Sequence, residues 1–169
     1  KGNLSQSLQF VPGIYHLSLE NIATLLIGYY AFKNITESKY IGIIAAWLYT
    51  LSVYRMVDLY TRGSMGEYLA LIFCPLALCG LFYIKNGEYS KWWVLAIAYC
   101  GLLQSHILTF VIMAMLAVGF ATIHIKKFMR MDSIIAILKA VISVILWNLW
   151  FLIPFLQASG IRTEEMDGS

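Results

Sequence analysis

Charged side chains are scarce in this sequence. Of 169 residues, 12 are Lys or Arg and 9 are Asp or Glu, so about 12% are charged, whereas soluble domains average roughly 25%. Hydrophobic residues make up 60% of the chain. This composition excludes an ordinary water-soluble domain, and its long apolar stretches separated by short polar clusters are typical of a polytopic membrane protein. The basic residues form no single stripe, so we expect no nucleic-acid partner.

Cysteine is rare as well. Cys74, Cys79 and Cys100 lie inside apolar stretches and show none of the spacings of metal ligands. We interpret them as small packing residues rather than as a metal site or a disulfide framework. The first residues lack the pattern of a signal peptide. Because the chain opens with Lys1 and closes on a polar segment, we interpret it as part of a longer protein.

The apolar stretches predict an all-α bundle of about six spanning helices, since a span needs ~20 mostly apolar residues. We expect an outer polar lead-in over residues 1–13, the helical bundle over 14–157 and an outer tail over 158–169 that leads into a further segment. The expected helices cover residues 14–32, 40–57, 68–84, 92–103, 107–123 and 134–156.

The apolar run over residues 92–123 decides this topology. As one helix of about 32 residues it would extend roughly 48 Å, which exceeds a ~30 Å hydrocarbon core. A turn at residues 104–106 divides it into two helices and places most basic residues on one side, which the positive-inside rule makes cytoplasmic. Both ends of the chain are then outside. The residues on the cytoplasmic side are Lys33, Lys39, Lys85, Lys91, Lys126, Lys127 and Arg130.

A charged segment interrupts the apolar chain at residues 54–67. Arg55, Asp58 and Arg62 are spaced i, i+3, i+7 and would share one face if the second helix continued outward. Two arginines that flank an aspartate suit a phosphate group, and the aspartate could orient an arginine, bind a metal ion or take a proton. The alternative is a self-paired loop, in which Arg55 and Asp58 form a surface ion pair of little energetic value.

Further polar residues are expected at the same outer face. Ser64 and Glu67 match the S-x-x-E capping box, which predicts a helix start whose free N–H groups favour an anion. His106, in the turn at residues 104–106, is either a hydrogen-bonded cap or a ligand of the same cavity. His16 and Glu20 would complete this cavity or solvate the entrance of a helix.

These motifs resemble a family of bacterial multispanning membrane proteins labelled 6-pyruvoyl-tetrahydropterin-synthase-related. The shared pattern is Y-R-x-x-D-x-Y-x-R-G-x-x-x-E, then a helix with Pro-Leu, then S-H-x-x-T. The resemblance is strong over residues 40–120 and weak at both ends. The matching residues are Tyr54, Arg55, Asp58, Tyr60, Arg62, Gly63, Glu67, Pro75, Ser105, His106 and Thr109.

That family is similar to the GT-C glycosyltransferases, which use a polyprenyl-phosphate-linked sugar at the outer face of the membrane. The resemblance implies a GT-C-like core that lacks its first helix, with a catalytic carboxylate upstream of Lys1. It also implies phosphate or substrate binding by Arg55, Tyr60, Arg62 and His106. Asp58 and Glu67 would support catalysis, and Asp58 would hold a divalent metal ion if one is used.

The implied partners are the lipid bilayer and a polyprenyl-phosphate sugar, and the implied location is the bacterial cytoplasmic membrane, crossed several times. Two alternatives stay open. A transporter or flippase for a lipid-linked sugar would use the same arginines without a base. A non-catalytic scaffold for cell-envelope assembly would need neither.

Overall fold

The computed structural model describes residues 3–57 and 64–167, with side chains over residues 18–57, 64–150 and 153–154. The described residues are helical and contain no strand, as the sequence predicts. The helices are α1 (Asn3–Thr36), α2 (Lys39–Thr50), α3 (Val53–Val57), α4 (Met65–Asn86), α5 (Trp92–Ser105), α6 (Ile107–Ile123), α7 (Ile125–Phe128) and α8 (Met131–Asp167), and a 3-10 turn, η2 (Tyr89–Lys91), precedes α5.

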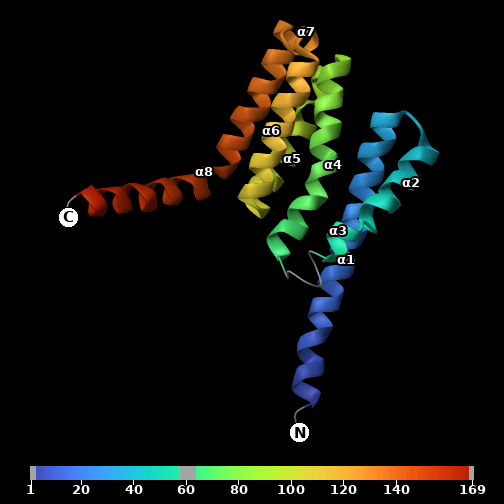
Figure 1. Ribbon diagram of the computed structural model, residues 1–169, viewed down its shortest axis with the longest axis vertical. Coiled ribbons are helices and arrows are strands. Elements are labelled where there is room, and N and C mark those ends of the chain that lie inside the picture. The colour runs from blue at the N-terminus through green and yellow to red at the C-terminus, as the bar shows by residue number, and fades with distance from the viewer. Residues whose placement is uncertain (1–2, 58–63, 168–169) are drawn as a thin grey trace.

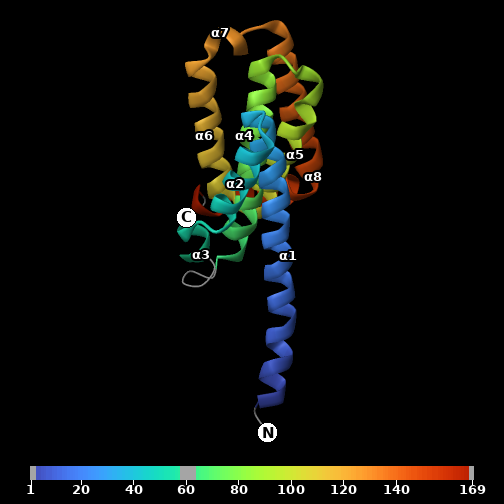
Figure 2. The same cartoon turned by 90° about the vertical axis from the view of Figure 1, so that its right-hand side faces the viewer.

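The helices stand side by side and alternate in direction (Figures 1 and 2). In packing order, α2 lies against α1, α1 against α4, α4 against α5 and α5 against α8, while α6 lies against α4 and α5. The N-terminal part of α1 and the C-terminal part of α8 extend away from this bundle (Figure 1). In this bundle the sequential pairs α1 and α2, α4 and α5, and α5 and α6 are antiparallel, while α1 packs on α4 and α5 packs on α8 between segments farther apart in the chain.

Membrane character is supported by helix length and composition. Three helical stretches in the described residues are long and apolar enough to cross a membrane: Lys39–Val57 with 19 residues, Met65–Asn86 with 22 and Met131–Trp150 with 20. Helix α6 is apolar but has only 17 residues. The chain thus has the helices of a membrane protein, and the count of six spans stays a prediction.

The long apolar run divides where the sequence predicts. Helix α5 ends at Ser105 and α6 begins at Ile107, while His106 between them has extended backbone with φ −157° and ψ 110°. One continuous helix is therefore excluded. The turns that carry the seven basic residues expected on the cytoplasmic side lie together at one end of the bundle, where Figure 1 shows α7 and the C-terminal end of α4.

The second expected helix, over residues 40–57, is interrupted. The N–H of Leu51 still bonds to the carbonyl of Trp47, but Ser52 bonds to Tyr49 in a tighter turn, and the helix restarts at Val53. The span predicted over residues 40–57 is long and apolar enough to cross a membrane, but the break inside it was not predicted, because the apolar pattern runs through it. Arg55 lies on the short α3, which ends at Val57. Asp58 and Arg62, expected on the same face, lie outside the described residues.

Small residues fill the seams between the helices. Apolar association offers no hydrophobic driving force inside lipid, so close backbone approach and van der Waals packing must hold such helices together. A methyl group at Gly80 of α4 would lie 2.8 Å from the Cα of Leu95 on α5, so only glycine fits at this position. The buried alanines of the seams are Ala31, Ala46, Ala70, Ala77, Ala96, Ala98, Ala136 and Ala140.

The topology predicts opposite accessibility for two exposed positions, Asn86 at the end of α4 and Gln104 near the end of α5. In a variant whose native cysteines are replaced by alanine, Gln104→Cys should react with a membrane-impermeant thiol reagent added outside, and Asn86→Cys should not. Permeabilised cells, in which both should react, are the control. External labelling of position 86 without labelling of position 104 would show that the bundle has the opposite orientation in the membrane.

The α4–α5 seam predicts that Gly80→Ala destabilises the bundle by about 1–3 kcal/mol, because the new methyl group meets backbone atoms that cannot move independently. Gly119 on α6 is the matched control, since nothing lies within 4 Å of a methyl group there. Gly119→Ala should leave stability unchanged or raise it by up to ~1 kcal/mol through helix propensity. Thermal unfolding in detergent compares the two variants. Equal stability of both would contradict the close packing of α4 on α5 at Gly80.

Candidate functional site

The site begins with one buried cation. The side chain of Arg55 is only 1% exposed, although the sequence predicts a residue at the mouth of the bundle. Its Nη2 donates a 2.8 Å hydrogen bond to Oγ1 of Thr24 on α1. Its guanidinium lies over the ring of Tyr68 on α4, 4.3 Å from the centroid, and 5.9 Å from the ring centroid of Tyr49 on α2. Four helices therefore meet at this guanidinium.

The surroundings of Arg55 form a polar cluster inside an apolar bundle. Thr24 Oγ1 donates to the carbonyl of Glu20, 2.7 Å away, and the Tyr68 hydroxyl donates to Oδ1 of Asn21 at 2.7 Å. Tyr49 donates to the carbonyl of Leu71 at 2.6 Å. We call Glu20, Asn21, Thr24, Tyr49, Arg55 and Tyr68 the Arg55 cluster. The tyrosine hydroxyls and the threonine are thus satisfied locally, as buried polar groups must be.

The guanidinium itself is only partly satisfied. Among the described residues, Nε and Nη1 of Arg55 are buried and have no hydrogen-bond partner. Burying a charge costs several kcal/mol unless partners replace its hydration. Faces of two aromatic rings offset part of this cost through cation–π attraction, worth up to about 2 kcal/mol when desolvated. The N–H groups of Nε and Nη1 can therefore donate to an anionic oxygen.

The carboxylate of Glu20 belongs to the same interior. Its side chain is 5% exposed and lies one helical turn before Thr24, on the same face of α1. An ionisable residue at this depth is a functional-site hypothesis by default. Of the two readings of Glu20, the structure favours the polar cavity over the solvated helix entrance. The side chain of His16 lies outside the described side chains.

Glu67 joins α4 to α3 instead of closing a capping box. Helix α4 starts at Met65, as predicted, but Ser64 makes no side-chain capping hydrogen bond. Oε1 of Glu67, which is 9% exposed, accepts a hydrogen bond from the hydroxyl of Tyr54. The expected reciprocal cap through the Ser64 hydroxyl was therefore wrong. The Tyr54–Glu67 bond brings together the two ends of the charged segment.

His106 caps α6. Its Nδ1 accepts the backbone N–H of Thr109 at 3.4 Å and lies 2.9 Å from the Thr109 hydroxyl. This assignment of the ring nitrogens leaves Nε2 as the N–H donor. The cap reading is confirmed, and it leaves a ligand role open because Nε2 is not needed for the cap. A methyl group at Gly66 would lie 2.8 Å from the Ser105 carbonyl oxygen, so the first turn of α4 packs closely on the α5–α6 turn.

The remaining predicted site residues, Asp58, Tyr60 and Arg62, lie outside the described residues, so a shared cavity with His106 stays a prediction. Among the described residues, no three His, Cys, Asp or Glu side chains form a group that could hold a metal ion. Sequence reasoning missed Thr24, Tyr49 and Tyr68, and the spacing of Glu20, Asn21 and Thr24 in an apolar helix was the available signal.

Comparison with protein-family models, with curated proteins and with solved structures finds no match to this chain. The geometry of the Arg55 cluster and the residue patterns are thus the basis of any functional assignment.

The Arg55 cluster predicts opposite effects for two buried threonines. Thr24→Val removes the acceptor of Arg55 Nη2 and should lower stability by about 1–3 kcal/mol, the cost of leaving a buried donor unpaired. Thr50 is the matched control, since its buried hydroxyl has no partner among the described residues. Thr50→Val should be neutral or stabilising. Denaturant unfolding in detergent measures both, and equal effects would rule out the Thr24–Arg55 bond as a stabilising contact.

Proposed function

We propose that this protein binds the phosphate of a polyprenyl-phosphate-linked sugar and acts as a GT-C-type glycosyltransferase in cell-envelope glycan assembly. The observation that carries the proposal is the buried guanidinium of Arg55, whose Nε and Nη1 have no hydrogen-bond partner among the described residues. Arginine binds phosphate through parallel N–H groups, and such bonds are strongest where water is excluded. The start of α4 beside this cluster adds a helix N-terminus, which also favours an anion.

The mechanism follows the chemistry of sugar transfer. A carboxylate that acts as general base takes the proton of an acceptor hydroxyl as its oxygen attacks the anomeric carbon. The bond between that carbon and the phosphate oxygen breaks, and the polyprenyl phosphate leaves with the electron pair. Arg55 and Arg62 stabilise the developing charge on the phosphate. Asp58 and Glu67 orient the arginines, while Tyr60 and His106 contact the substrate.

The proposed setting is the outer face of the bacterial cytoplasmic membrane. The bundle would cross this membrane six times and would correspond to helices two to seven of a GT-C core. The clustering of basic turns at the end opposite to the Arg55 cluster supports this orientation. A divalent metal ion at Asp58 is part of the proposal only as an optional partner of the phosphate.

A lipid-linked sugar transporter is the second candidate function. The depth of the Arg55 cluster favours it, because buried ionisable residues inside a helix bundle also mark substrate pathways. A transporter would bind the same phosphate through the same arginines and would need no base. The two functions differ in whether a glycosidic bond forms.

Arg62 tests the phosphate role. Arg62→Ala should abolish both sugar transfer and the binding of polyprenyl monophosphate. Arg62→Lys should retain only part of the activity, because lysine keeps the charge but loses the planar fork. Purified variants in detergent are compared in both assays. Lys39→Ala, which removes an exposed charge at the opposite end, is the matched control and should behave as wild type.

Thermal unfolding separates binding from folding. A variant that unfolds like wild type but neither binds nor transfers supports the proposal, and binding without transfer in the wild-type protein supports the transporter. Wild-type activity of Arg62→Ala would refute the phosphate role of that residue.

A further inference from the structure

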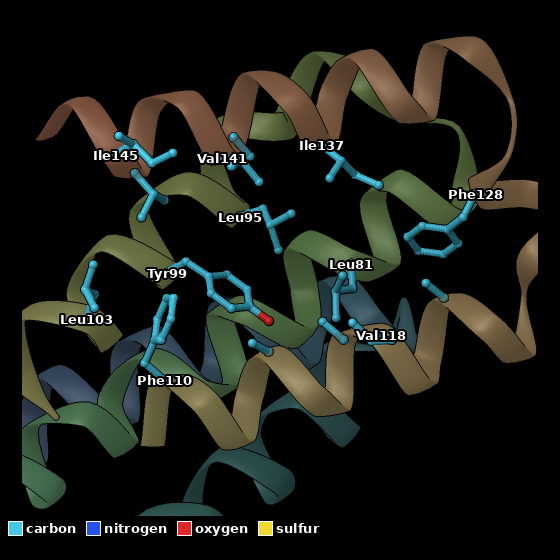
Figure 3. A pocket seen from close by; sticks show the side chains of 15 residues that line it. Leu81, Leu95, Tyr99, Leu103, Phe110, Val118, Phe128, Ile137, Val141 and Ile145 are labelled. Atoms are coloured by element: carbon cyan, nitrogen blue, oxygen red, sulfur yellow. The ribbon is translucent and has the colours of Figure 1, made fainter. Parts of the chain in front are cut away.

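A second site lies on the other side of the bundle, against α8. An apolar cavity of about 370 Å³ opens between α6 and α8 and has α4 and α5 as its floor (Figure 3). The cavity is open to the surroundings between α6 and α8, since Val118 of α6 is 65% exposed and Val141 of α8 is 48% exposed. We call this cavity the α6–α8 groove. Its lining is Leu81, Leu95, Tyr99, Leu103, Phe110, Ala114, Ala117, Val118, Ala121, Phe128, Ile137, Ala140, Val141, Val144 and Ile145.

The groove exists because α6 packs loosely. Met113 is the only buried residue of α6. Small side chains at Ala114, Ala117 and Ala121 leave space on the side of α6 that faces α8. The one polar group in the lining, the Tyr99 hydroxyl, donates to the Met113 carbonyl at 2.9 Å. No polar group of the lining therefore needs a hydrogen-bond partner from the molecule that fills the groove.

The size of the groove suits a hydrocarbon chain and not a helix. Ten residues of helix with a diameter of ~10 Å would need roughly 1,200 Å³, about three times the volume of the groove. The void lies at the flank of the stretch of α8 that is long and apolar enough to cross a membrane. In a bilayer it would face lipid tails, and leaving it empty would forfeit the van der Waals contacts of its walls. A single flexible chain can fill it.

The charge at one end of the groove selects the headgroup. Phe128 lines this end and lies on α7, beside Lys126 and Lys127. These lysines and Arg130 are exposed, and no ion pair involves them in the part of the chain that the structure describes. Asp132 is the carboxylate next along the chain, and Glu88 is paired with Lys91 at 2.6 Å. The rim is therefore net positive.

We propose that the α6–α8 groove binds one acyl chain of an anionic glycerophospholipid, whose phosphate lies against Lys126, Lys127 and Arg130. Basic residues at the cytoplasmic end of membrane helices attract anionic lipid, and the attraction grows with each Lys or Arg. The apolar groove supplies the binding of the chain, and the basic rim supplies the preference for charge. This site is at the opposite end from the Arg55 cluster and does not rest on the proposed glycosyltransferase function.

Native mass spectrometry of the purified protein in non-ionic detergent tests the site. Phosphatidylglycerol should bind about tenfold more tightly than phosphatidylcholine with the same acyl chains, given three basic residues at the rim. Lys126→Gln, Lys127→Gln and Arg130→Gln together should reduce phosphatidylglycerol binding to the phosphatidylcholine level. Lys39→Gln is the control for charge loss elsewhere and should change nothing.

Filling the groove tests the position of the chain. Ala114→Phe should weaken binding of both phospholipids, whereas Leu116→Phe, on an exposed position of α6 outside the lining, should not. If thermal unfolding shows that Ala114→Phe does not fold, Val141→Phe narrows the groove from α8 and should give the same loss. Equal binding of the two phospholipids, tighter binding of polyprenyl monophosphate than of phosphatidylglycerol, or a dimer that excludes lipid would each overturn the proposal.

Discussion

The guanidinium of Arg55 sits where α1, α2, α3 and α4 meet, and the polar end of the bundle is organised around it. Each neighbouring element contributes something that this charge needs: a hydroxyl from Thr24, the ring faces of Tyr49 and Tyr68, and α3 itself, which turns the arginine inward. Because a charge inside hydrocarbon is costly unless it is surrounded, moving any of these helices would expose it to lipid. The arrangement of these four helices therefore depends on the burial of this one cation.

The sequence predicts where the helices begin and end better than it predicts the contacts between them. Apolar length and the turn at His106 are local signals, and they place α4, α5 and α6 within a few residues of their ends. The sequence did not predict the break before α3, because Leu51 and Ser52 do not interrupt the apolar pattern. The inward position of Arg55 was not predicted for a different reason. It depends on the rings of residues 49 and 68, and contacts between different helices produce no pattern in the spacing of residues along the chain. Likewise, the capping-box pattern of Ser64 and Glu67 could not show that Tyr54 would engage the carboxylate.

The two halves of the bundle differ in the residues that line their interior. Around Arg55, polar groups face inward and satisfy one another only in part, through hydrogen bonds and ring faces. Around the α6–α8 groove, the lining is apolar and the fit comes from small side chains that leave room. The first arrangement suits a ligand defined by its charge, and the second suits one defined by its flexibility and lack of polarity.

The loose attachment of α6 has a consequence for how this sequence can change over evolutionary time. A helix with one buried residue, Met113, places few packing demands on its other positions, and any apolar side chain of moderate size meets them. The α4–α5 seam has no such freedom, because a single methyl group at Gly80 collides with the neighbouring backbone. Substitutions should therefore accumulate in α6 while the seam stays nearly fixed, so related chains would diverge first in the shape of the groove and last in the α4–α5 seam.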